Sequence, residues 1–227
     1  MDRIVVIGAS GHAKVITDII EENGQNEIFG FIDSFKKIGT KILGYEVIGD
    51  ERQIPYLIKK EGITKGIIAI GDNWLRKEMF KKIKAISHNF EYVSAIHPSA
   101  IISNYSTIGR GVAIMAGAVI NAEARVEDFS IVNTKASLGH ESILKKYGSL
   151  SSGVIVGGSV HIGPFTAISI GATIINNISI GKHSVIGAGA VVTKNIGNFQ
   201  VVYGIPAKFV HNRKKGENYL RSNVISP

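Results

Sequence analysis

The clearest hydrophobic pattern in the chain is a repeat of six residues that fills its C-terminal half. The residue two places before each aliphatic position is usually small or β-branched, and the residue just after it is repeatedly Gly. A repeat of fixed length indicates one structural unit stacked many times. Every sixth position from 102 to 192 is Ile, Val or Leu: Ile102, Ile108, Ile114, Ile120, Val126, Val132, Leu138, Leu144, Leu150, Val156, Ile162, Ile168, Ile174, Ile180, Ile186 and Val192.

The length of this repeat decides what the unit is. A period of six fits neither a helix, with its period of 3.6, nor a flat alternating strand, with its period of 2. It fits a short strand followed by a turn, in which the aliphatic side chain points inward and glycine relieves crowding at the turn. Three hexads then close one triangular coil, and the repeat predicts about five coils stacked roughly 4.8 Å apart into a three-sided prism.

The first ninety residues alternate between strand and helix patterns. Apolar runs predict strands over 3–8, 27–33, 65–73 and 90–96, and helical spacing predicts helices over 9–24 and 74–87. Such alternation predicts a small parallel sheet with helices on its faces. We therefore expect a small α/β, Rossmann-like domain over residues 1–95, and the prism with a C-terminal tail over residues 96–227.

The first strand ends in a glycine turn that leads into a helix. The turn has the pattern G-x-x-G, from Gly8 to Gly11, and Ser10 and Ala13 stand where the dinucleotide fingerprint needs two further glycines. This disfavours NAD. The free amides and positive dipole end of the helix still suit an anion, and Asp33, at the end of the second strand, is placed to meet a ribose hydroxyl. A phosphate-bearing nucleotide is the predicted ligand, with a purely structural turn as the alternative.

Composition narrows the function classes. The net charge of +8 suits phosphorylated small molecules, but the absence of a basic helix or of aromatic residues among the basic ones argues against nucleic acid. The densest basic cluster, "HNRKKGENYLRSN" at 211–223, is interpreted as a solvated tail. Zero Cys excludes a thiol nucleophile and fits a reducing compartment, and no apolar run is long enough for a membrane span. A cytoplasmic protein is expected.

Several segments together carry a resemblance to a known family. "IVVIGASGHAKVI", "GFIDS", "IAIGDNWLRKEM", "IHPSAIIS", "INAEARVEDFSIVNTKASLGHES" and "VVYGIPAKFV" occur in the order typical of the nucleotide-sugar acetyltransferases of bacterial glycan synthesis. These enzymes N-acetylate 4-amino-4,6-dideoxy sugars on UDP, dTDP or GDP, and the sialic acid O-acetyltransferases are close relatives. The resemblance implies that the prism is a left-handed parallel β-helix and that the protein is a homotrimer.

The resemblance also implies a catalytic group. His140 lies two places after inward-facing Leu138, so it should fall at an outward turn of the prism. It matches the histidine of the family pattern N-T-x-x-x-x-x-H-E, which implies a general base for the amine that attacks the thioester. Glu141 would orient His140, provided that the turn brings the two side chains together. Asn133 would bind the sugar or the developing oxyanion, or would simply be a turn asparagine.

Further positions follow from the same resemblance. Acetyl-CoA is the implied cosubstrate, lying along the groove between two prisms near Gly158 and Ala188, with Gly158 one coil above His140. Ser149 stands where some relatives have a second histidine that contacts the thioester oxygen, so that contact depends on a hydroxyl here. Arg76 has a surface charge on a helix as its alternative. The implied nucleotide-sugar site comprises Gly8, Gly11, His12, Asp33, Gly71, Asn73 and Arg76.

Two alternative functions and the possibility of a metal site remain to be considered. An O-acetyltransferase acting on sialic acid or a related sugar needs the same base and cosubstrate. A nucleotide-sugar-binding scaffold without chemistry is opposed by the His-Glu motif. His161 and His183 occupy different places within their hexads from His140, so the three need not converge, and no metal is expected.

Overall fold

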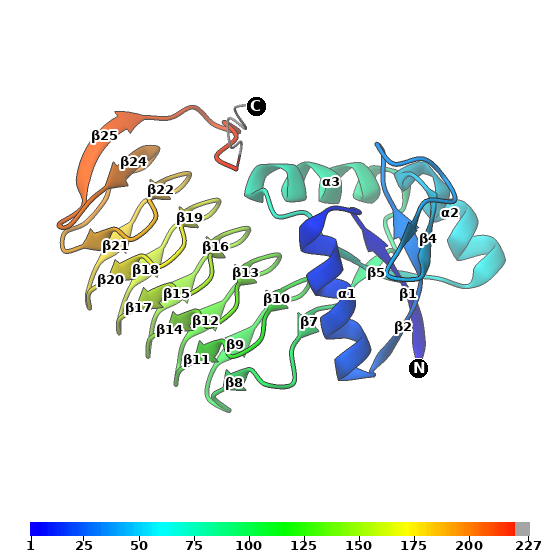
Figure 1. Cartoon of the computed structure of the whole chain (residues 1–227), viewed down its shortest axis with the longest axis horizontal. Coiled ribbons are helices and arrows are strands. Elements are labelled where there is room, and N and C mark those ends of the chain that lie inside the picture. The colour runs from blue at the N-terminus through cyan, green and yellow to red at the C-terminus, as the bar shows by residue number, and fades with distance from the viewer. Residues whose placement is uncertain (221–227) are drawn as a thin grey trace.

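A computed structural model describes residues 1–220 as two packed domains (Figure 1). The first has a six-stranded sheet in the order β3-β4-β2-β1-β5-β6, in which all neighbours are parallel except β3 and β4. No helix within the described residues is both long and apolar enough to cross a membrane. The elements of this domain are β1 (Asp2–Ile7), α1 (Gly11–Asn23), β2 (Asn26–Ile32), β3 (Lys41–Ile42), β4 (Tyr45–Gly49), η1 (Glu51–Gln53), α2 (Ile54–Tyr56), η2 (Leu57–Glu61), β5 (Lys65–Ile68), α3 (Asn73–Ile86) and β6 (Glu91–Tyr92).

The two long helices form where the sequence gives them an apolar stripe and an end signal. In α1, Ala13, Ile16, Ile19 and Ile20 recur at helical spacing and are buried, and the helix stops at Gly24, whose φ of 65° suits glycine. Helix α3 is capped by the Asp72 side chain, which accepts hydrogen bonds from the backbone amides of residues 74 and 75, both at 2.9 Å.

The Rossmann-like prediction is confirmed, with two differences in detail. The single strand expected over 90–96 is wrong, because its two ends join different sheets: β6 pairs with β5, and β7 (Ala95–Ile96) pairs with β10 of the second domain. Residues 41–61, for which no strand or helix was predicted, supply the edge strands β3 and β4 and the short helices after them.

The second domain is the three-sided prism that the hexad repeat predicts, and it is the left-handed parallel β-helix that the family resemblance implies. Each coil is eighteen residues long, since Ala113 pairs with Ile131 and Arg125 pairs with Ile143. Its strands are β7 (Ala95–Ile96), β8 (Ile101–Ile102), β9 (Thr107–Ile108), β10 (Ala113–Ile114), β11 (Val119–Ile120), β12 (Arg125–Val126), β13 (Ile131–Val132), β14 (Ser137–Leu138), β15 (Ile143–Leu144), β16 (Ser149–Leu150), β17 (Ile155–Val156), β18 (His161–Ile162), β19 (Ala167–Ile168), β20 (Thr173–Ile174), β21 (Ser179–Ile180), β22 (Val185–Ile186), β23 (Val191–Val192), β24 (Gln200–Tyr203) and β25 (Lys208–Asn212).

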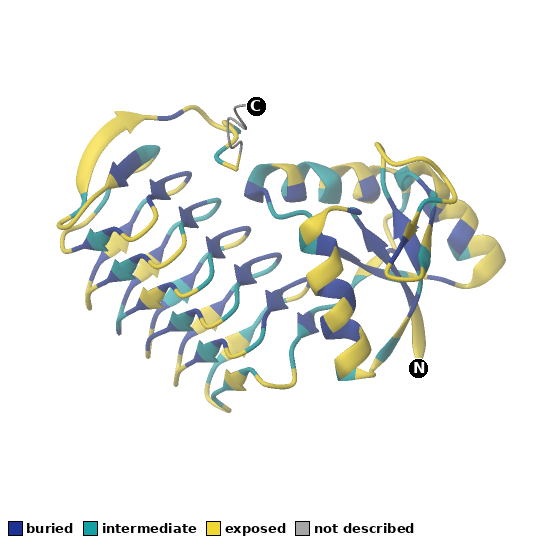
Figure 2. Ribbon diagram, viewed as in Figure 1, coloured by how far each residue is buried: buried dark blue, intermediate teal, exposed yellow. Residues whose placement is uncertain are grey.

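The strands form three faces, which we name after their first strands. The β7 face runs from β7 through β10, β13, β16, β19 and β22 to β24, the β8 face from β8 to β23, and the β9 face from β9 to β21. The turns between them form three rows, called the β7/β8, β8/β9 and β9/β7 corners. Figure 2 shows that strands of the β7 face are mostly buried, whereas many strands of the other two faces combine buried residues with exposed ones.

The predicted interior column is confirmed. The aliphatic residues of the repeat pack in one cluster, and only Ile102 and Ile108, in the first coil, are less than fully buried. The small polar residues beside them are buried as well, and their hydroxyls are bonded back to the turns: Ser142 Oγ donates to the Gly157 carbonyl at 2.8 Å and Thr166 Oγ1 to the Gly181 carbonyl at 2.6 Å. The core is therefore continuous without unsatisfied hydroxyls at these two positions.

The first domain covers much of the β7 face. Outward residues Ala95, Ala113 and Ile131 of this face share an apolar cluster with α1, and the Asn23 side chain donates to the Ile96 carbonyl at 2.9 Å. Helix α3 packs at the β9/β7 corner, where Phe129 belongs to the same cluster as the inner side of α3. The two domains consequently share a core rather than meeting at a hinge.

The C-terminal segment returns to this junction after β25. The interpretation of 211–223 as a solvated tail is wrong for Arg213, which is buried, and for Tyr219, which packs on Ala167, Val185 and Val201 of the β7 face. Residues 221–223 lie outside the described part of the chain. The many charges of this segment predicted a solvated tail, although Arg213 is buried and Tyr219 packs against apolar side chains.

Candidate active site

A cavity of about 340 Å³ opens at the carboxyl edge of the parallel sheet, between β1 and β5. This is the position at which open α/β sheets bind their ligands. Its walls are mainly apolar. They are formed by the turn after β1, the loop after β2, the end of β5 and one side of α3, through Gly8, Ala9, Ser10, Ile32, Asp33, Ser34, Phe35, Ile70, Leu75, Glu78, Met79 and Lys82.

Two of the residues predicted to bind the nucleotide, Gly8 and Asp33, line this cavity. Gly8 has a φ of 106°, and a Cβ there would stand 2.9 Å from the Ala69 carbonyl oxygen, so the turn requires glycine. The Asp33 carboxylate accepts backbone hydrogen bonds from Ala9, Phe35 and Lys36 at 2.8 to 2.9 Å. Asp33 thus ties the turn after β1 to the loop after β2 and has little capacity left for a ribose hydroxyl. Gly11 begins α1, where a Cβ would meet no neighbour.

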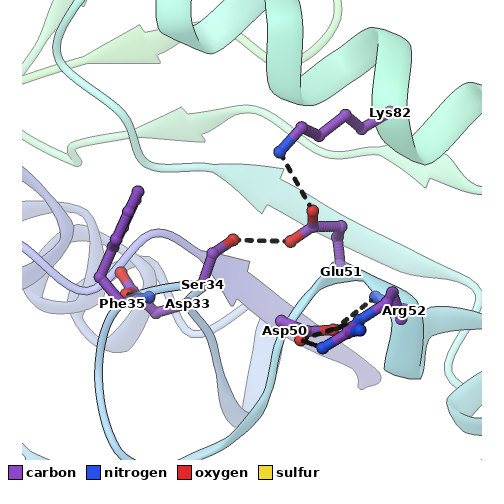
Figure 3. Close-up of polar contacts among 7 residues, drawn as sticks. All are labelled: Asp33, Ser34, Phe35, Asp50, Glu51, Arg52 and Lys82. Carbon is purple, nitrogen blue, oxygen red and sulfur yellow. Dashed lines mark hydrogen bonds and ion pairs between the residues drawn. The ribbon is translucent and has the colours of Figure 1, made fainter.

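A series of polar contacts links Ser34 and Lys82, two residues of the cavity wall, through Glu51 (Figure 3). The Glu51 carboxylate accepts from Ser34 Oγ at 2.6 Å and from Lys82 Nζ at 3.2 Å. These contacts join the loop after β2 to α3 through η1. Phe35 stands beside this series with 98% of its surface exposed, so its ring is free to cover a ligand.

Asn73 and Arg76 lie inside the protein rather than in the cavity wall. Arg76 is 1% exposed, and its guanidinium donates to the carbonyls of Phe129, Ile70, Gly71 and Tyr147 and to Asn73 Oδ1, at 2.7 to 3.3 Å. Asn73 Nδ2 donates to the Thr166 carbonyl at 3.2 Å. Both side chains therefore join α3 to the β-helix. Neither a nucleotide-binding role nor, for Arg76, a surface charge describes this position, so both predictions for Arg76 miss its structural contacts.

His12, Gly71 and Ser149 meet at the junction with the C-terminal segment. Burial and the nearby guanidinium of Arg76 lower the pKa of His12 to about 4, so the imidazole is neutral near pH 7. The Tyr219 hydroxyl lies 3.4 Å from Ser149 Oγ and 3.5 Å from the Gly71 carbonyl oxygen. Ser149 is 7% exposed, so this segment covers it.

His140 and Glu141 form an exposed pair at the β8/β9 corner. Glu141 adopts a left-handed φ of 59°, and this turn brings its Oε2 within 3.2 Å of His140 Nδ1. Glu141 Oε2 also accepts from Ser159 Oγ of the next coil at 3.0 Å. The hydrogen bond from Ser159, together with the one to His140, lowers the pKa of the Glu141 carboxyl. The His140 side chain is 64% exposed, so its ring is accessible.

Gly158 lies directly against the His140 ring. A Cβ at position 158 would stand 2.2 Å from His140 Nε2, which no side chain could tolerate without moving the imidazole. The Gly158 amide donates to Asn176 Oδ1 at 3.0 Å. The expected stacking of position 158 above His140 is therefore observed.

The other two predicted residues of the β-helix lie at a different corner. Asn133 follows β13 and Ala188 follows β22, so both are at the β7/β8 corner, where Asn133 Oδ1 accepts from the Thr134 amide at 2.7 Å. The β8 face separates this corner from His140. A single chain does not bring these residues together.

Sequence reasoning missed the cavity wall formed by α3. Leu75, Glu78, Met79 and Lys82 recur at the spacing of one helix face, which was the available signal. Their mixture of apolar and charged residues is typical of an ordinary surface helix, so no binding site was predicted there. Phe35 was missed for a different reason, because a single aromatic residue in a loop belongs to no periodic pattern.

His161 and His183 lie apart, as their hexad positions suggest. His161 is exposed on β18, whereas His183 is buried at the β9/β7 corner between Phe165 and Phe199, with ring centroids 4.6 and 5.0 Å away. Among residues 1–220, no three His, Asp or Glu side chains are grouped in a way that could hold a metal ion.

Comparisons with known proteins agree with this geometry. Residues 3–83 match the family model described as the PglD N-terminal domain. UDP-N-acetylbacillosamine N-acetyltransferase of Bacillus subtilis is 31% identical over 117 residues, which are 51% of this chain and 52% of that protein. The chain thus spans about half the length of this curated relative.

Solved structures match over nearly the whole chain. PerB of Caulobacter crescentus, in complex with CoA and GDP-perosamine, is 34% identical with a TM-score of 0.86 over 93% of this chain and 98% of its own. The acetyltransferase domain of PglB from Neisseria gonorrhoeae, in complex with acetyl coenzyme A, is 32% identical with a TM-score of 0.84 over 92% and 98%. Because the identity exceeds 30% over nearly the whole of both chains, this chain belongs to the acetyl-CoA-dependent nucleotide-sugar N-acetyltransferases of the left-handed β-helix family.

Proposed function

We propose that this protein transfers the acetyl group of acetyl-CoA to the amino group of a nucleotide-linked 4-amino-4,6-dideoxy sugar in bacterial surface glycan synthesis. The observation that carries the proposal is the exposed His140–Glu141 pair, held at 3.2 Å at a corner of the β-helix. Structures similar over nearly the whole chain hold CoA together with an amino sugar on a nucleotide. The enzyme would act in the cytoplasm, since a chain with no cysteine suits a reducing compartment.

His140 acts as the general base. Glu141 accepts the Nδ1 proton of His140, which leaves Nε2 unprotonated and able to take a proton from the attacking amine. The amine nitrogen forms a bond to the thioester carbon, the C–S bond breaks, and the proton held by His140 passes to the departing CoA sulfur. The products are the amide and free CoA thiol, so atoms and charge balance. Asn133 is assigned to stabilise the oxyanion or the sugar.

The site requires two chains. His140, Glu141 and Gly158 occupy the β8/β9 corner, whereas Asn133 and Ala188 occupy the β7/β8 corner. If three β8 faces meet about a threefold axis, the β8/β9 corner of each chain lies next to the β7/β8 corner of the following chain. Such an arrangement unites the two groups at each of three identical grooves, and acetyl-CoA would occupy these grooves.

The β8 face has the character of such an interface. Its outward residues are Ile101, Val119, Ser137, Ile155, Thr173 and Val191, and Ile101 and Ile155 are largely exposed. The β9 face instead presents Thr107, Arg125, Ile143, His161 and Ser179, and the β7 face is covered by the first domain and Tyr219. An outward surface that is mainly aliphatic and carries no charge supports the assignment of the β8 face to a homotrimer contact.

A second candidate shares this geometry. O-acetylation of sialic acid or a related sugar would use the same base, because a sugar hydroxyl also loses its proton as it attacks the thioester. The apolar cavity on the first domain favours a nucleotide-linked acceptor over a free sugar. A scaffold without chemistry is opposed by the exposed His-Glu pair.

Thiol release separates these functions. Purified protein is mixed with acetyl-CoA and each of UDP-, dTDP- and GDP-linked 4-amino sugars, with free sialic acid as the competing acceptor. We expect thiol release, and a product heavier by one acetyl group, with at least one amino sugar. Turnover with sialic acid alone would establish the second candidate, and turnover with neither would overturn the assignment.

A further inference from the structure

Ser159 contacts both members of the His140–Glu141 pair but has no part in the proposed reaction. It follows β17 at the β8/β9 corner, eighteen residues and therefore one coil beyond Glu141. Its backbone amide donates to the His140 carbonyl at 2.8 Å. The stacking of the coils thus fixes Ser159 directly against the pair.

The Ser159 hydroxyl is a second donor to the oxygen that contacts the imidazole. Ser159 Oγ donates to Glu141 Oε2 at 3.0 Å, and the same oxygen lies 3.2 Å from His140 Nδ1. A hydroxyl has one proton to donate, and a hydrogen bond to a carboxylate is stronger than one between neutral groups. The three side chains therefore form a series in which Ser159 holds Glu141 from the next coil.

The pair needs such an anchor because it lies on the surface. The side chains of His140 and Glu141 are 64% and 58% exposed, and an exposed pair alone does little to restrict two side chains. The hydrogen bond from Ser159, with the one to His140, also lowers the pKa of Glu141, so the carboxylate is ionised near neutral pH. Ser159 therefore restricts the rotamers of an ionised carboxylate that solvent would otherwise leave free.

We propose that Ser159 is a positioning residue for acetyl transfer: its hydroxyl fixes the Glu141 carboxylate so that it accepts the Nδ1 proton of His140. The tautomer of an imidazole is set by the hydrogen bond that one ring nitrogen makes, so this contact leaves Nε2 free to receive the proton of the amine. Ser159 acts through Glu141 and touches no reacting atom. The inference rests on the proposed function for the role of His140, but the tautomer can be measured without acetyl transfer.

The backbone at Ser159 permits a clean removal of the hydroxyl. Its φ is 55°, a left-handed value that glycine adopts without strain, so Ser159→Gly keeps the turn. We expect kcat to fall at least about fivefold, with KM for both substrates within about twofold, because a misplaced base affects the chemical step. The thermal unfolding midpoint should stay within about 4 °C of the parent value. Unchanged kcat in Ser159→Gly would overturn the inference.

Leu43→Gly is the matched control for the change in backbone freedom. Leu43 also has a left-handed φ, of 48°, and lies exposed in the turn between β3 and β4 of the first domain. We expect this variant to keep the parent kcat. An equal loss of kcat in Leu43→Gly and Ser159→Gly would show that added flexibility, and not the hydroxyl, is responsible.

A double-mutant cycle tests whether Ser159 acts through Glu141. Glu141 has a left-handed φ of 59°, so Glu141→Gly removes the carboxylate without straining the turn. In this background Ser159→Gly should lower kcat less than about twofold, because no carboxylate remains to be held. A loss as large as in the parent protein would mean that the two residues act independently, which contradicts the inference.

The tautomer of His140 provides a readout that needs no substrate. Long-range ¹⁵N–¹H spectra of the full-length protein with labelled histidine report it, and His140→Ala identifies the signals. We expect the neutral ring to carry its proton mainly on Nδ1 in the parent and mainly on Nε2 in Ser159→Gly. The same tautomer in both proteins would refute the role of Ser159. A change of tautomer in a protein that transfers no acetyl group would instead remove the proposed function and leave the positioning by Ser159 standing.

Discussion

At the scale of residues, the orientation of His140 depends on three neighbours from two coils. Glu141 reaches Nδ1 because its φ is left-handed, Ser159 holds Glu141 from the coil above, and Gly158 leaves room for the ring. A general base gains from such fixed geometry, because proton transfer requires a well-aligned contact. In the proposed mechanism, each neighbour therefore acts by positioning the imidazole of His140.

Removal of the imidazole should affect the chemical step and not binding. We expect His140→Ala to lower kcat at least about a hundredfold, in line with the contribution of a general base. The affinity for nucleotide should stay within about twofold, because the cavity lies on the first domain. Steady-state kinetics and calorimetry measure the two quantities. Unchanged kcat in His140→Ala would remove this residue from the mechanism.

A methyl group on Gly158 should have a related effect by a different route. The added Cβ of Gly158→Ala would stand 2.2 Å from His140 Nε2, so the ring must move. We expect kcat to fall at least about tenfold while the protein stays folded. Gly62→Ala, at the end of η2 in the first domain, is the control, since a Cβ there meets no neighbour and costs stability only, through the left-handed φ of 68°. Equal kcat losses in both variants would show that the effect is not steric at His140.

The sequence predicted part of this site for a clear reason. The register of the hexads fixes which residues face outward, so the positions of His140 and Gly158 followed from counting. Arg76 could not be interpreted in the same way, because its partners are backbone carbonyls of Phe129 and Tyr147, more than fifty residues away in the chain. Only the packing of the two domains reveals that contact.

At the scale of elements, the β9/β7 corner is held by a ladder of stacked rings. Consecutive rings are 4.6 to 5.2 Å apart with interplanar angles of 13° or less, and every member has a positive φ. Such stacking adds to the burial of each ring. The ladder consists of Phe129, Tyr147, Phe165, His183 and Phe199.

The histidine in this ladder should make stability depend on pH. Burial, with the nearby charges of Arg213 and Lys215, lowers the pKa of His183 to about 4. The unfolded chain takes up this proton near the ordinary pKa of 6.5, so the free energy of unfolding should fall as the pH drops from about 6.5 to 4. His12, whose pKa is also about 4, acts in the same direction.

Denaturant unfolding of His183→Phe between pH 7 and 4 checks this prediction. Phenylalanine fits between Phe165 and Phe199, so we expect the variant to lose less stability on acidification than the parent protein. His161→Gln, which changes an exposed histidine on β18, should keep the parent's pH dependence. The same pH slope in His183→Phe as in the parent would contradict the prediction.

The ladder was not predicted from the sequence, because its residues repeat with a period other than the hexad. Phe129, Tyr147, Phe165 and His183 recur every eighteen residues, which is once per coil and not once per hexad. The break between β6 and β7 was hidden for another reason. Residues 90–96 read as one apolar strand, and only the competing pairings with β5 and β10 divide them.

At the scale of the whole molecule, the three faces of the β-helix have separate tasks. The β7 face carries the first domain and Tyr219, the β9 face is mainly polar, and the β8 face is uncharged, mainly apolar and open. This division follows from outward positions that alternate with the interior column along each strand. Net charge and hexad counting alone therefore did not predict which face would join the chains of the proposed trimer.

A charge on the β8 face should dissociate the proposed trimer. Ile155 is 54% exposed in the single chain and would be buried at the threefold axis, where three unpaired lysines would repel one another. Light scattering after gel filtration should give three times the 24.4 kDa chain mass for the parent protein and one chain for Ile155→Lys. Ser179→Lys, on the polar β9 face, should remain trimeric. A monomeric parent would refute the arrangement.

The central claim is that each active site combines His140 of one chain with the β7/β8 corner of the next, which carries Asn133 and Ala188. Mixing two inactive variants after joint refolding tests it: His140→Ala, and Ala188→Trp, whose indole should fill the groove at this corner and exclude acetyl-CoA. Random mixed trimers contain both intact halves at roughly a quarter of their sites, so thiol release should recover to roughly a quarter of the parent rate. No recovery from mixed trimers, with each variant folded and trimeric, would show that one chain contains the whole site and would contradict the account.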